Sequence, residues 1–355
     1  MTPSRKLFTP GPVPVEAHIL AKGAEQPPYN RTQDFSRFTK EILQGLGLVF
    51  QTSGPIALLT GSGTAAMEAA VLNFLDTSDR VLVINGGTFG QRWCDLCRVH
   101  TIPYTELKLN AGEDIDLDRL SQTLSREKFT ALLINAHETS TGQLYDIEAI
   151  GRITREFDLL YIVDAISTIC ADPFLMDAWH VDVTVLSSQK ALALPPGLSF
   201  IAMSERAQSR LGEITPKSLY FNLADYLNNQ ERGQAPFTPA IGLFLQLHQR
   251  LRDIEQRTLP DVIDQHRQRA CYFRKSIAYL PFDTMPSRQS NAVTSILCKE
   301  HDAFEIVQRL RSQFDMETAP SGGALKHKIF RVSHMGAQND ADVDALISAL
   351  TVLTR

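Results

Sequence analysis

Six short apolar runs in the N-terminal part of the chain constrain its fold more than any other feature. They cover residues 56–60, 80–86, 130–136, 159–167, 182–188 and 198–204. Each run is almost continuously apolar, which is typical of strands buried on both faces of a sheet. Helical patterns lie between most of the runs, as at residues 146–158. This alternation of strand and helix predicts an α/β domain with a mostly parallel sheet.

A different pattern follows towards the C-terminus, where long helical segments meet near Pro260 and two strand candidates come after them. The helical segments are 237–256, 259–280, 302–314 and 341–353, and the strand candidates are 292–299 and 328–334. This order predicts a smaller α+β unit. We expect an N-terminal arm at 1–14, a large domain at 15–260 and a small C-terminal domain at 261–355. Three prolines and a glycine in "FTPGPVPV" predict that the arm is extended and not helical.

The composition narrows the classes of function. The 355 residues carry a net charge of −5 and no block of lysine or arginine, which argues against nucleic acid or a membrane surface as a partner. No run is long and apolar enough to span a membrane, and the first residues lack the apolar core of a secretion signal. We therefore expect a cytoplasmic protein.

The five cysteines are few and scattered, so we expect reduced thiols. Cys94 and Cys97 form a C-x-x-C pair, but a zinc site would need a second pair or nearby histidines. The pattern favours a helix with both cysteines on one face, and we expect no metal site.

Polar residues stand where the predicted strands end, and ligands of doubly wound sheets collect at that edge. The segments concerned are Gly61–Thr64, Gly86–Phe89, His137–Thr139, Asp164 and Ser187–Lys190. The first of them, "TGSGT", is a glycine turn that opens a helix, and such a helix start favours a phosphate group. It is neither a P-loop nor a complete dinucleotide fingerprint, because Ala66 replaces the third glycine. Ordinary helix capping remains the alternative.

Lys190 falls just past a buried strand, where a lysine must be paired, deprotonated or used covalently. A surface lysine on a loop is the alternative. Asp164 ends another apolar strand and needs a cation, or else caps the segment that follows. Phe89 is a core residue or a stacking platform. His137 has no second histidine at ligand spacing, so we expect it to be structural or to contact a bound ring.

The combination of these groups is more specific than any one of them. Pyridoxal phosphate needs a lysine that forms an imine, a carboxylate that keeps the pyridine nitrogen protonated, an aromatic residue on the ring and a helix start for the phosphate. The strand ends of this chain offer all four.

At these residues the chain resembles the class V aminotransferases of fold type I. The likeness is to alanine–glyoxylate (serine–pyruvate) and 2-aminoethylphosphonate–pyruvate aminotransferases. The motifs run in order from "TPGP" through "GSGTAAME", "NGGTFGQRW", "HETSTG", "VDAIS", "SSQKALALPPG" and "FTPA" to "FRVSHMG", and so cover nearly the whole chain. The resemblance implies a large domain with a mostly parallel sheet, a smaller α+β domain and pyridoxal 5′-phosphate as the cofactor.

The resemblance also implies a role for each candidate residue. Lys190 is similar to the Schiff-base lysine that moves the proton, and Asp164 to the partner of the pyridinium nitrogen. Arg331 resembles the clamp for the substrate carboxylate, a task that suits a planar guanidinium. The remaining implied contacts are Phe89 and Ile166 on the two ring faces, Ser62, Gly63, Thr64 and Gln189 at the phosphate, Thr139 at the ring hydroxyl, and Thr238 at the phosphate of a neighbouring subunit, which implies a homodimer.

Some residues depart from the resemblance. Relatives often carry glycines where this chain has Cys170-Ala171-Asp172, and often Trp or Tyr in place of Phe89. The cluster Lys326-His327-Lys328 is a second anion site or, the reading we favour, a solvated loop. Arg31 and Arg92 are weaker candidate anion contacts.

We expect an aminotransferase that moves an amino group from alanine, serine or 2-aminoethylphosphonate to pyruvate or glyoxylate by a ping-pong mechanism. The main alternative is a pyridoxal-phosphate-dependent lyase or desulfurase on the same fold. A desulfurase needs a cysteine on a mobile loop, and the surroundings of Cys271 and Cys298 do not predict one. A non-catalytic or dinucleotide-binding α/β protein is the third possibility, and the pair Lys190 and Asp164 argues against it.

Overall fold

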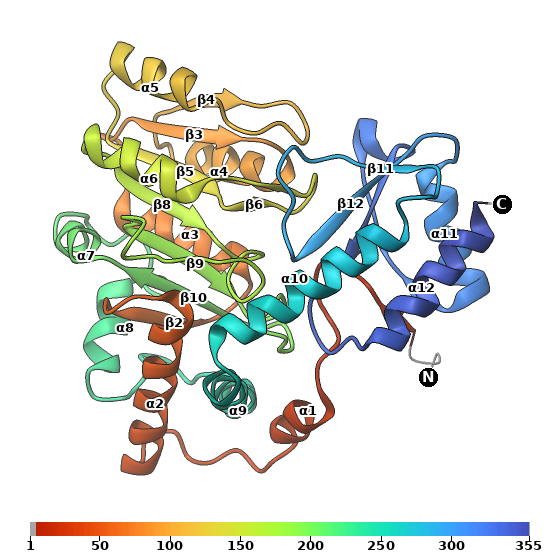
Figure 1. Cartoon of the computed structure of the whole chain (residues 1–355). Helices are drawn as coiled ribbons and strands as arrows, with labels where there is room; N and C mark the ends of the chain where they lie inside the picture. Colours follow the sequence, from red (N-terminus) through yellow and green to blue (C-terminus); the bar gives the residue numbers. More distant parts are fainter. Residues whose placement is uncertain (1–4, 355) are drawn as a thin grey trace.

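The computed structural model describes residues 5–354, and a seven-stranded sheet lies at its centre (Figure 1). In spatial order the strands are β2 Ile56–Thr60, β10 Leu198–Met203, β9 Val183–Ser187, β8 Leu160–Asp164, β5 Ala131–Asn135, β3 Val81–Asn85 and β4 Tyr104–Lys108. Only β10 runs antiparallel to its neighbours, so the carboxyl ends of the other six meet at one edge. The predicted α/β class and all six predicted strands are confirmed. Strand β4 is absent from the prediction, because "YTELK" is a partly exposed edge strand with a polar sequence.

Alternate residues of the strands enter two separate hydrophobic clusters, one on each face of the sheet. Leu82 and Ile84 belong to the first cluster, whereas Val81 and Val83 belong to the second. The first cluster is covered by α1 Ala17–Gly23, α2 Gln33–Phe50, α5 Leu117–Arg126, α6 Ile147–Glu156 and α9 Ile241–Arg257. The second cluster is covered by α3 Gly63–Phe74, α4 Thr88–Val99, α7 Glu205–Leu211 and α8 Leu223–Gln230. Burial on both faces is the physical reason for the nearly continuous apolar runs.

A second, four-stranded antiparallel sheet forms the C-terminal part of the fold. Its strands in order are β11 Phe282–Thr284, β12 Val293–Cys298, β15 Ile329–Ser333 and β14 Ala319–Pro320. A third hydrophobic cluster joins it to α11 Ala303–Phe314, α12 Asp340–Leu353 and the end of α10 Leu259–Ser276. In Figure 1, α10 runs from the large sheet to this smaller one. Thr258, at a φ of 69°, separates α9 from α10, close to the predicted break at Pro260. The domain boundary itself stays a prediction.

The N-terminal segment is extended, as predicted, and no helix precedes Ala17 in the described part of the arm. Residues 1–4 of the predicted arm lie outside the described residues. Strand β1 Lys6–Leu7 pairs in parallel with β13 Met316–Glu317. Phe8 is buried in the third cluster and Val13 in the first. The arm therefore connects the core beneath the small sheet with the core beneath the large one.

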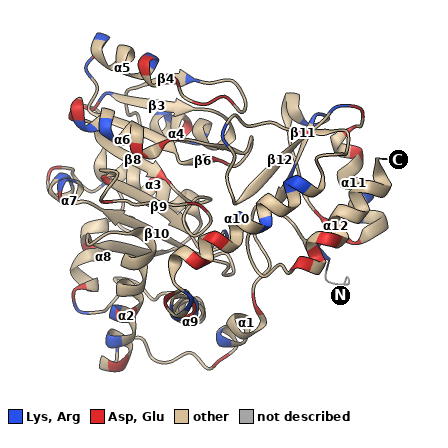
Figure 2. Ribbon diagram, in the orientation of Figure 1, with Lys and Arg blue, Asp and Glu red and all other residues tan. Residues whose placement is uncertain are grey.

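Acidic and basic side chains are interspersed along the elements (Figure 2). None of the described helices has the length and apolar character needed to cross a membrane.

Replacement of Phe8 by alanine tests the attachment of the arm. The side chain is 1% exposed, and its backbone donates to Glu317 and accepts from Ser333. Loss of a buried phenyl ring costs about 3–5 kcal/mol, so we expect Phe8→Ala to lower the free energy of unfolding in urea by that amount. Leu20→Ala is the control, because Leu20 is 49% exposed. Equal stability of the two variants would contradict the buried arm.

Candidate active site

Lys190 lies in the turn that joins β9 to the antiparallel strand β10. This turn is tightly held: the Ser188 hydroxyl donates to the Pro195 carbonyl at 2.7 Å, and Arg250 Nε donates to the Leu192 carbonyl at 3.0 Å. The prolines and glycine of "SSQKALALPPG" thus close a compact connection between two paired strands. Because the backbone of this turn is held in place, the Lys190 side chain starts at a fixed position at the carboxyl edge of the sheet.

The surroundings of Lys190 favour its neutral, nucleophilic amine. Burial, followed by the charge of Arg331, lowers the pKa of Lys190 to about 8, although Asp164 acts in the opposite direction. The arm passes directly over this side chain. A Cβ atom on Gly11, at a φ of +142°, would lie 2.8–3.0 Å from the outer atoms of Lys190. The glycine of "TPGP" therefore lets the arm backbone approach the amine closely.

Asp164 ends β8, next to the strand that precedes Lys190, and its carboxylate is 5% exposed. One oxygen accepts from Asn135 Nδ2 at 2.6 Å and the other from the backbone N–H of Ile166 at 2.8 Å. Burial raises the pKa of Asp164 to about 6, and the negative charge of Glu138 adds to the rise. The two ionisable groups of the site are thus shifted towards each other in pKa, as in many active sites.

The short strand β6 His137–Glu138 and the residues after it pack beside Asp164. Ser167 Oγ lies 2.7 Å from Thr139 Oγ1 and 2.9 Å from His137 Nδ1. Burial lowers the pKa of His137 to about 3, so its ring is neutral, and its buried Nε2 has no hydrogen-bond partner within residues 5–354. These surroundings agree with the prediction that the His137 ring is structural or contacts a bound ring.

Arg331 reaches this cluster from β15 of the smaller sheet. Its two terminal nitrogens donate to the carbonyls of Thr139 and Pro320, each at 2.9 Å. Its Nε is buried and finds no acceptor in the described part of the chain. Burial lowers the pKa of Arg331, while the charge of Glu138 raises it. The guanidinium therefore lies near Lys190 and retains donors for a further acceptor.

The N-terminus of α3 is an open anion-binding position. Its N-cap residue Ser62 makes no side-chain capping bond. A Cβ on Gly63 would come within 2.5 Å of Ile166 Cδ1 and 3.2 Å of Ser187 Oγ, so the helix start packs closely on both segments. Buried Ser187 Oγ and Gln189 Oε1 lack partners among the described atoms. Free backbone N–H groups and unsatisfied buried polar atoms at one place suit an oxygen-rich anion.

Helix α4 completes this face of the site. Arg92 donates to Thr64 Oγ1 at 2.9 Å, and its guanidinium carbon lies 4.9 Å from the centre of the Phe89 ring. The structure thus brings Phe89 and Arg92 to the start of α3. The sequence predicts Arg92 only as a weaker anion contact, because the distance along the chain between Thr64 and Arg92 gives no sign that the two side chains touch.

The remaining candidate residues are exposed or are bound to other partners. Thr238 is exposed on the loop before α9, where Arg31 donates to the neighbouring carbonyl of Ala235 at 2.8 Å. His327 pairs with Asp302 at 2.7 Å, and Lys326 lies over the ring of Phe304 at 4.4 Å, as expected of a solvated loop.

Three of the cysteines have thiols that are not activated. Cys94 and Cys97 are buried in α4, as predicted, and burial raises the pKa of each thiol to about 12. Burial does the same to Cys298. These thiols are therefore not poised as nucleophiles.

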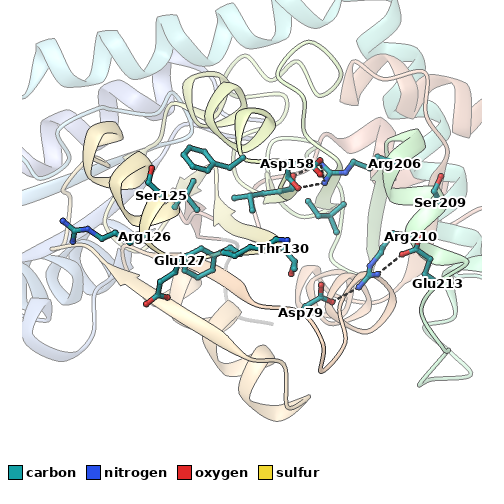
Figure 3. Close-up of a pocket in the computed structure, with 16 residues that line it drawn as sticks. Asp79, Ser125, Arg126, Glu127, Thr130, Asp158, Arg206, Ser209, Arg210 and Glu213 are labelled. Carbon is teal, nitrogen blue, oxygen red and sulfur yellow. Dashed lines mark hydrogen bonds and ion pairs between the residues drawn. The ribbon is translucent and has the colours of Figure 1, made fainter.

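A separate hollow of about 610 Å³ lies around the opposite ends of the strands (Figure 3). Its lining includes Asp79 and Thr130, each just before a parallel strand. Two of its basic residues already have partners, since Arg206 pairs with Asp158 and Arg210 with Asp79. It shares no residue with the site around Lys190.

Comparison with known proteins shows the family. The model described as "Aminotransferase class-V" matches residues 30–346. The chain belongs to the class V aminotransferase family. This confirms the resemblance seen in the motifs and identifies the protein as an enzyme of the aminotransferase type. The fold agrees: an alanine–glyoxylate aminotransferase from Nostoc sp. superposes with a TM-score of 0.95 at 29% identity, over 100% of this chain and 96% of that one.

Curated relatives span most of the chain as well. An L-aspartate–glyoxylate aminotransferase of Paracoccus denitrificans is 30% identical over 96% of this chain and 89% of its own length. A protein named "Soluble hydrogenase, small subunit" from Synechococcus sp. (strain PCC 6716) is 32% identical over 97% of this chain and 91% of its own length. The two names describe different activities, and the arrangement around Lys190 favours amino transfer.

The titration of Asp164 predicts a pH-dependent gain in stability for one variant. A carboxyl whose pKa rises from 3.8 to about 6 on folding favours the folded state below pH 4, and this contribution is lost as the pH rises through 6. Asp164→Asn avoids the burial of the charge, and Asn135 has an unpartnered Oδ1 that a flipped amide could offer to the new side chain.

We therefore expect the Asp164→Asn protein, without cofactor, to be about 1–3 kcal/mol more stable than the wild type at pH 8, with a smaller difference at pH 4.5. Urea unfolding at the two pH values measures the effect. Asp118→Asn, at an exposed helix start, serves as the control. A constant or inverted difference would contradict the raised pKa.

Proposed function

We propose that the protein is a pyridoxal-phosphate-dependent aminotransferase that passes an amino group from a small donor to pyruvate or glyoxylate. The observation that carries the proposal is the meeting of Lys190, Asp164, Arg331 and the open start of α3 at one sheet edge. Family membership supports the reaction type.

The residues present fit this cofactor. The phosphate would be held at the uncapped start of α3 by Ser62, Gly63, Thr64 and Gln189. Gly63 has no side chain and packs closely on Ile166 and Ser187, so no Cβ atom covers the backbone N–H groups of this helix start. Asp164 would accept from the ring nitrogen, Thr139 would face the ring hydroxyl, and Phe89 and Ile166 would bracket the ring. When bound, pyridoxal phosphate supplies an electron sink, so that the amino group passes in two half-reactions.

The remaining steps are assigned to residues of this chain. The Lys190 amine, with a pKa of about 8, is neutral often enough at neutral pH to take a proton from the donor Cα and to return it to the acceptor. Arg331 orients the substrate carboxylate with the donors that its two carbonyl partners leave free. The arm at Gly11 limits the access of water to the amine.

Names of relatives suggest the substrates. Curated relatives at 29–30% identity are named as alanine–glyoxylate, serine–glyoxylate and L-aspartate–glyoxylate aminotransferases. We infer glyoxylate or pyruvate as the acceptor, with alanine and serine as the first donors to test, and 2-aminoethylphosphonate and aspartate after them. A lyase or desulfurase reaction is less supported. Two NifS-like proteins and a cysteine desulfurase share only the fold with this chain, at 12–14% identity. Cys298 is partly buried, and this burial raises the pKa of its thiol.

The proposal includes a homodimer. Thr238 is exposed, as a residue that completes a partner's phosphate site would be. The same side of the chain carries exposed apolar residues, with Leu219 78% exposed and Tyr220 stacked on Phe237. The cytoplasmic location stays a prediction.

Replacement of Lys190 by alanine tests the function directly. The variant loses the proton carrier, so we expect transamination to fall by at least about a thousandfold. The measurement is the absorption of the enzyme-bound cofactor while each donor, and then pyruvate or glyoxylate, is added. Wild-type enzyme should lose its long-wavelength band with a true donor and regain it with the acceptor. Appreciable steady-state transamination by the variant would refute the role of Lys190.

Replacement of Arg331 by glutamine tests the carboxylate clamp. Loss of a bidentate guanidinium should raise the KM for the amino donor by roughly tenfold to a hundredfold. Arg311→Gln is the matched control, because Arg311 pairs with Glu317 in the small domain and lies away from the site. Steady-state kinetics with both variants gives the comparison. An unchanged KM in Arg331→Gln would place the substrate carboxylate elsewhere.

A further inference from the structure

Glu138 is a buried acidic residue to which the functions above give no role. It lies in β6, its side chain is 1% exposed, and it directly precedes Thr139. Its carboxylate accepts from the backbone N–H groups of Phe89 at 3.1 Å and Gly90 at 2.9 Å. It also accepts from the N–H group of Ser140 at 3.1 Å and from the Ser140 hydroxyl. Every partner is a donor, which is the pattern of an ionised carboxylate.

Two of the partners of Glu138, Phe89 and Gly90, belong to the first turn of α4. The remaining N–H group of this turn, that of Thr88, donates to Ser140 Oγ at 3.1 Å. Side chains of residues 138 and 140 therefore satisfy the N–H groups of residues 88–90. A helix N-terminus attracts negative charge, and in α4 the protein itself supplies that charge.

The two helices that start beside Lys190 differ in this respect. The start of α3 has no side-chain cap, whereas the start of α4 is filled by Glu138. An incoming phosphate therefore finds only one of these two helix starts open. The Glu138 carboxylate thus leaves α3 as the place for the phosphate, while α4 supports Phe89.

The contact between Glu138 and α4 is also tight. A Cβ on Gly87 would lie 2.8 Å from Glu138 Cδ and 2.5 Å from Ser140 Oγ. The backbone that leads into α4 is thus pressed against the carboxylate, and the position of Glu138 determines that of Phe89 and, one turn on, Arg92. Arg92 in turn reaches Thr64 in α3.

We propose that Glu138 is a positioning residue for the cofactor: its buried carboxylate fastens the first turn of α4, sets the ring-stacking Phe89 and leaves α3 as the phosphate site. This inference rests on the proposed function, because the position of Phe89 matters only if a ring binds beside it.

The test compares Glu138→Gln with Glu68→Gln. The first variant keeps the size of the side chain but turns an amide nitrogen towards backbone N–H donors and removes the charge. The second removes a carboxylate that also links α3 to α4, through His100 at 2.9 Å, away from the helix starts. Each protein is prepared without cofactor and titrated with pyridoxal phosphate, and the visible circular dichroism is recorded at saturation.

We expect Glu138→Gln to raise the dissociation constant of pyridoxal phosphate at least about tenfold and to reduce the circular dichroism of the bound cofactor at saturation. Glu68→Gln should match the wild type in both. Lower thermal stability alone would not change the dichroism of the saturated enzyme, so that readout separates positioning from general destabilisation. Wild-type affinity and dichroism in Glu138→Gln would overturn the inference.

A second variant keeps the test decisive if glutamine disturbs folding. Glu138→Ala leaves a space that formate can enter, so formate should restore cofactor affinity, whereas chloride at equal ionic strength should not. Equal effects of formate and chloride would overturn the role of the carboxylate. Failure of the wild type itself to bind pyridoxal phosphate would instead refute the proposed function.

Discussion

The burial of an amine and a carboxylate at the same edge of one sheet is the constraint on which the rest of the site depends. Each group resists burial in its charged form, so the pKa of Lys190 falls and that of Asp164 rises. Both groups are therefore held in a state that costs folding free energy, as is usual where a protein prepares chemistry. A ligand with a protonated ring nitrogen would add a cationic partner to the hydrogen bonds that Asp164 already accepts from Asn135 and Ile166.

The reversed strand β10 explains how Lys190 is held. Strands β2 and β3 lead into the helices α3 and α4, whereas β9 returns through residues 188–197 into its antiparallel neighbour β10. A short connection between antiparallel strands needs no helix and leaves little freedom to the residues in it. Ser188 and Arg250 fix it further by bonding its carbonyls. The backbone of Lys190 is thereby held rigidly, although it lies outside regular secondary structure.

Three parts of the chain that are distant in sequence meet around Lys190. The arm lies against Lys190 at Gly11, the large sheet supplies Asp164, and the small sheet sends Arg331 to the carbonyl of Thr139. A relative movement of the small sheet would move the guanidinium and leave the lysine in place. Under the proposed function, the residue for the substrate carboxylate and the residue for the cofactor therefore lie on different structural units.

Sequence patterns determined much of this protein. Continuous apolar runs identified the buried strands, because a strand covered on both faces excludes polar residues. Lys190 and Asp164 could be recognised at the ends of those runs, since a charged group at the end of a buried strand is costly unless it has a partner or a chemical role. The edge strand β4 escaped detection because one side of it faces solvent.

Tertiary structure alone decided which side chains meet. Glu138 reads in sequence as one more acidic residue, and only the packing of β6 on α4 shows that it fills a helix start. Arg92 gains its place from the approach of α4 to α3, and Asn135 from the pairing of β5 with β8. Contacts of this kind join residues 28 to 49 positions apart, and the local periodicity of a sequence carries no record of them.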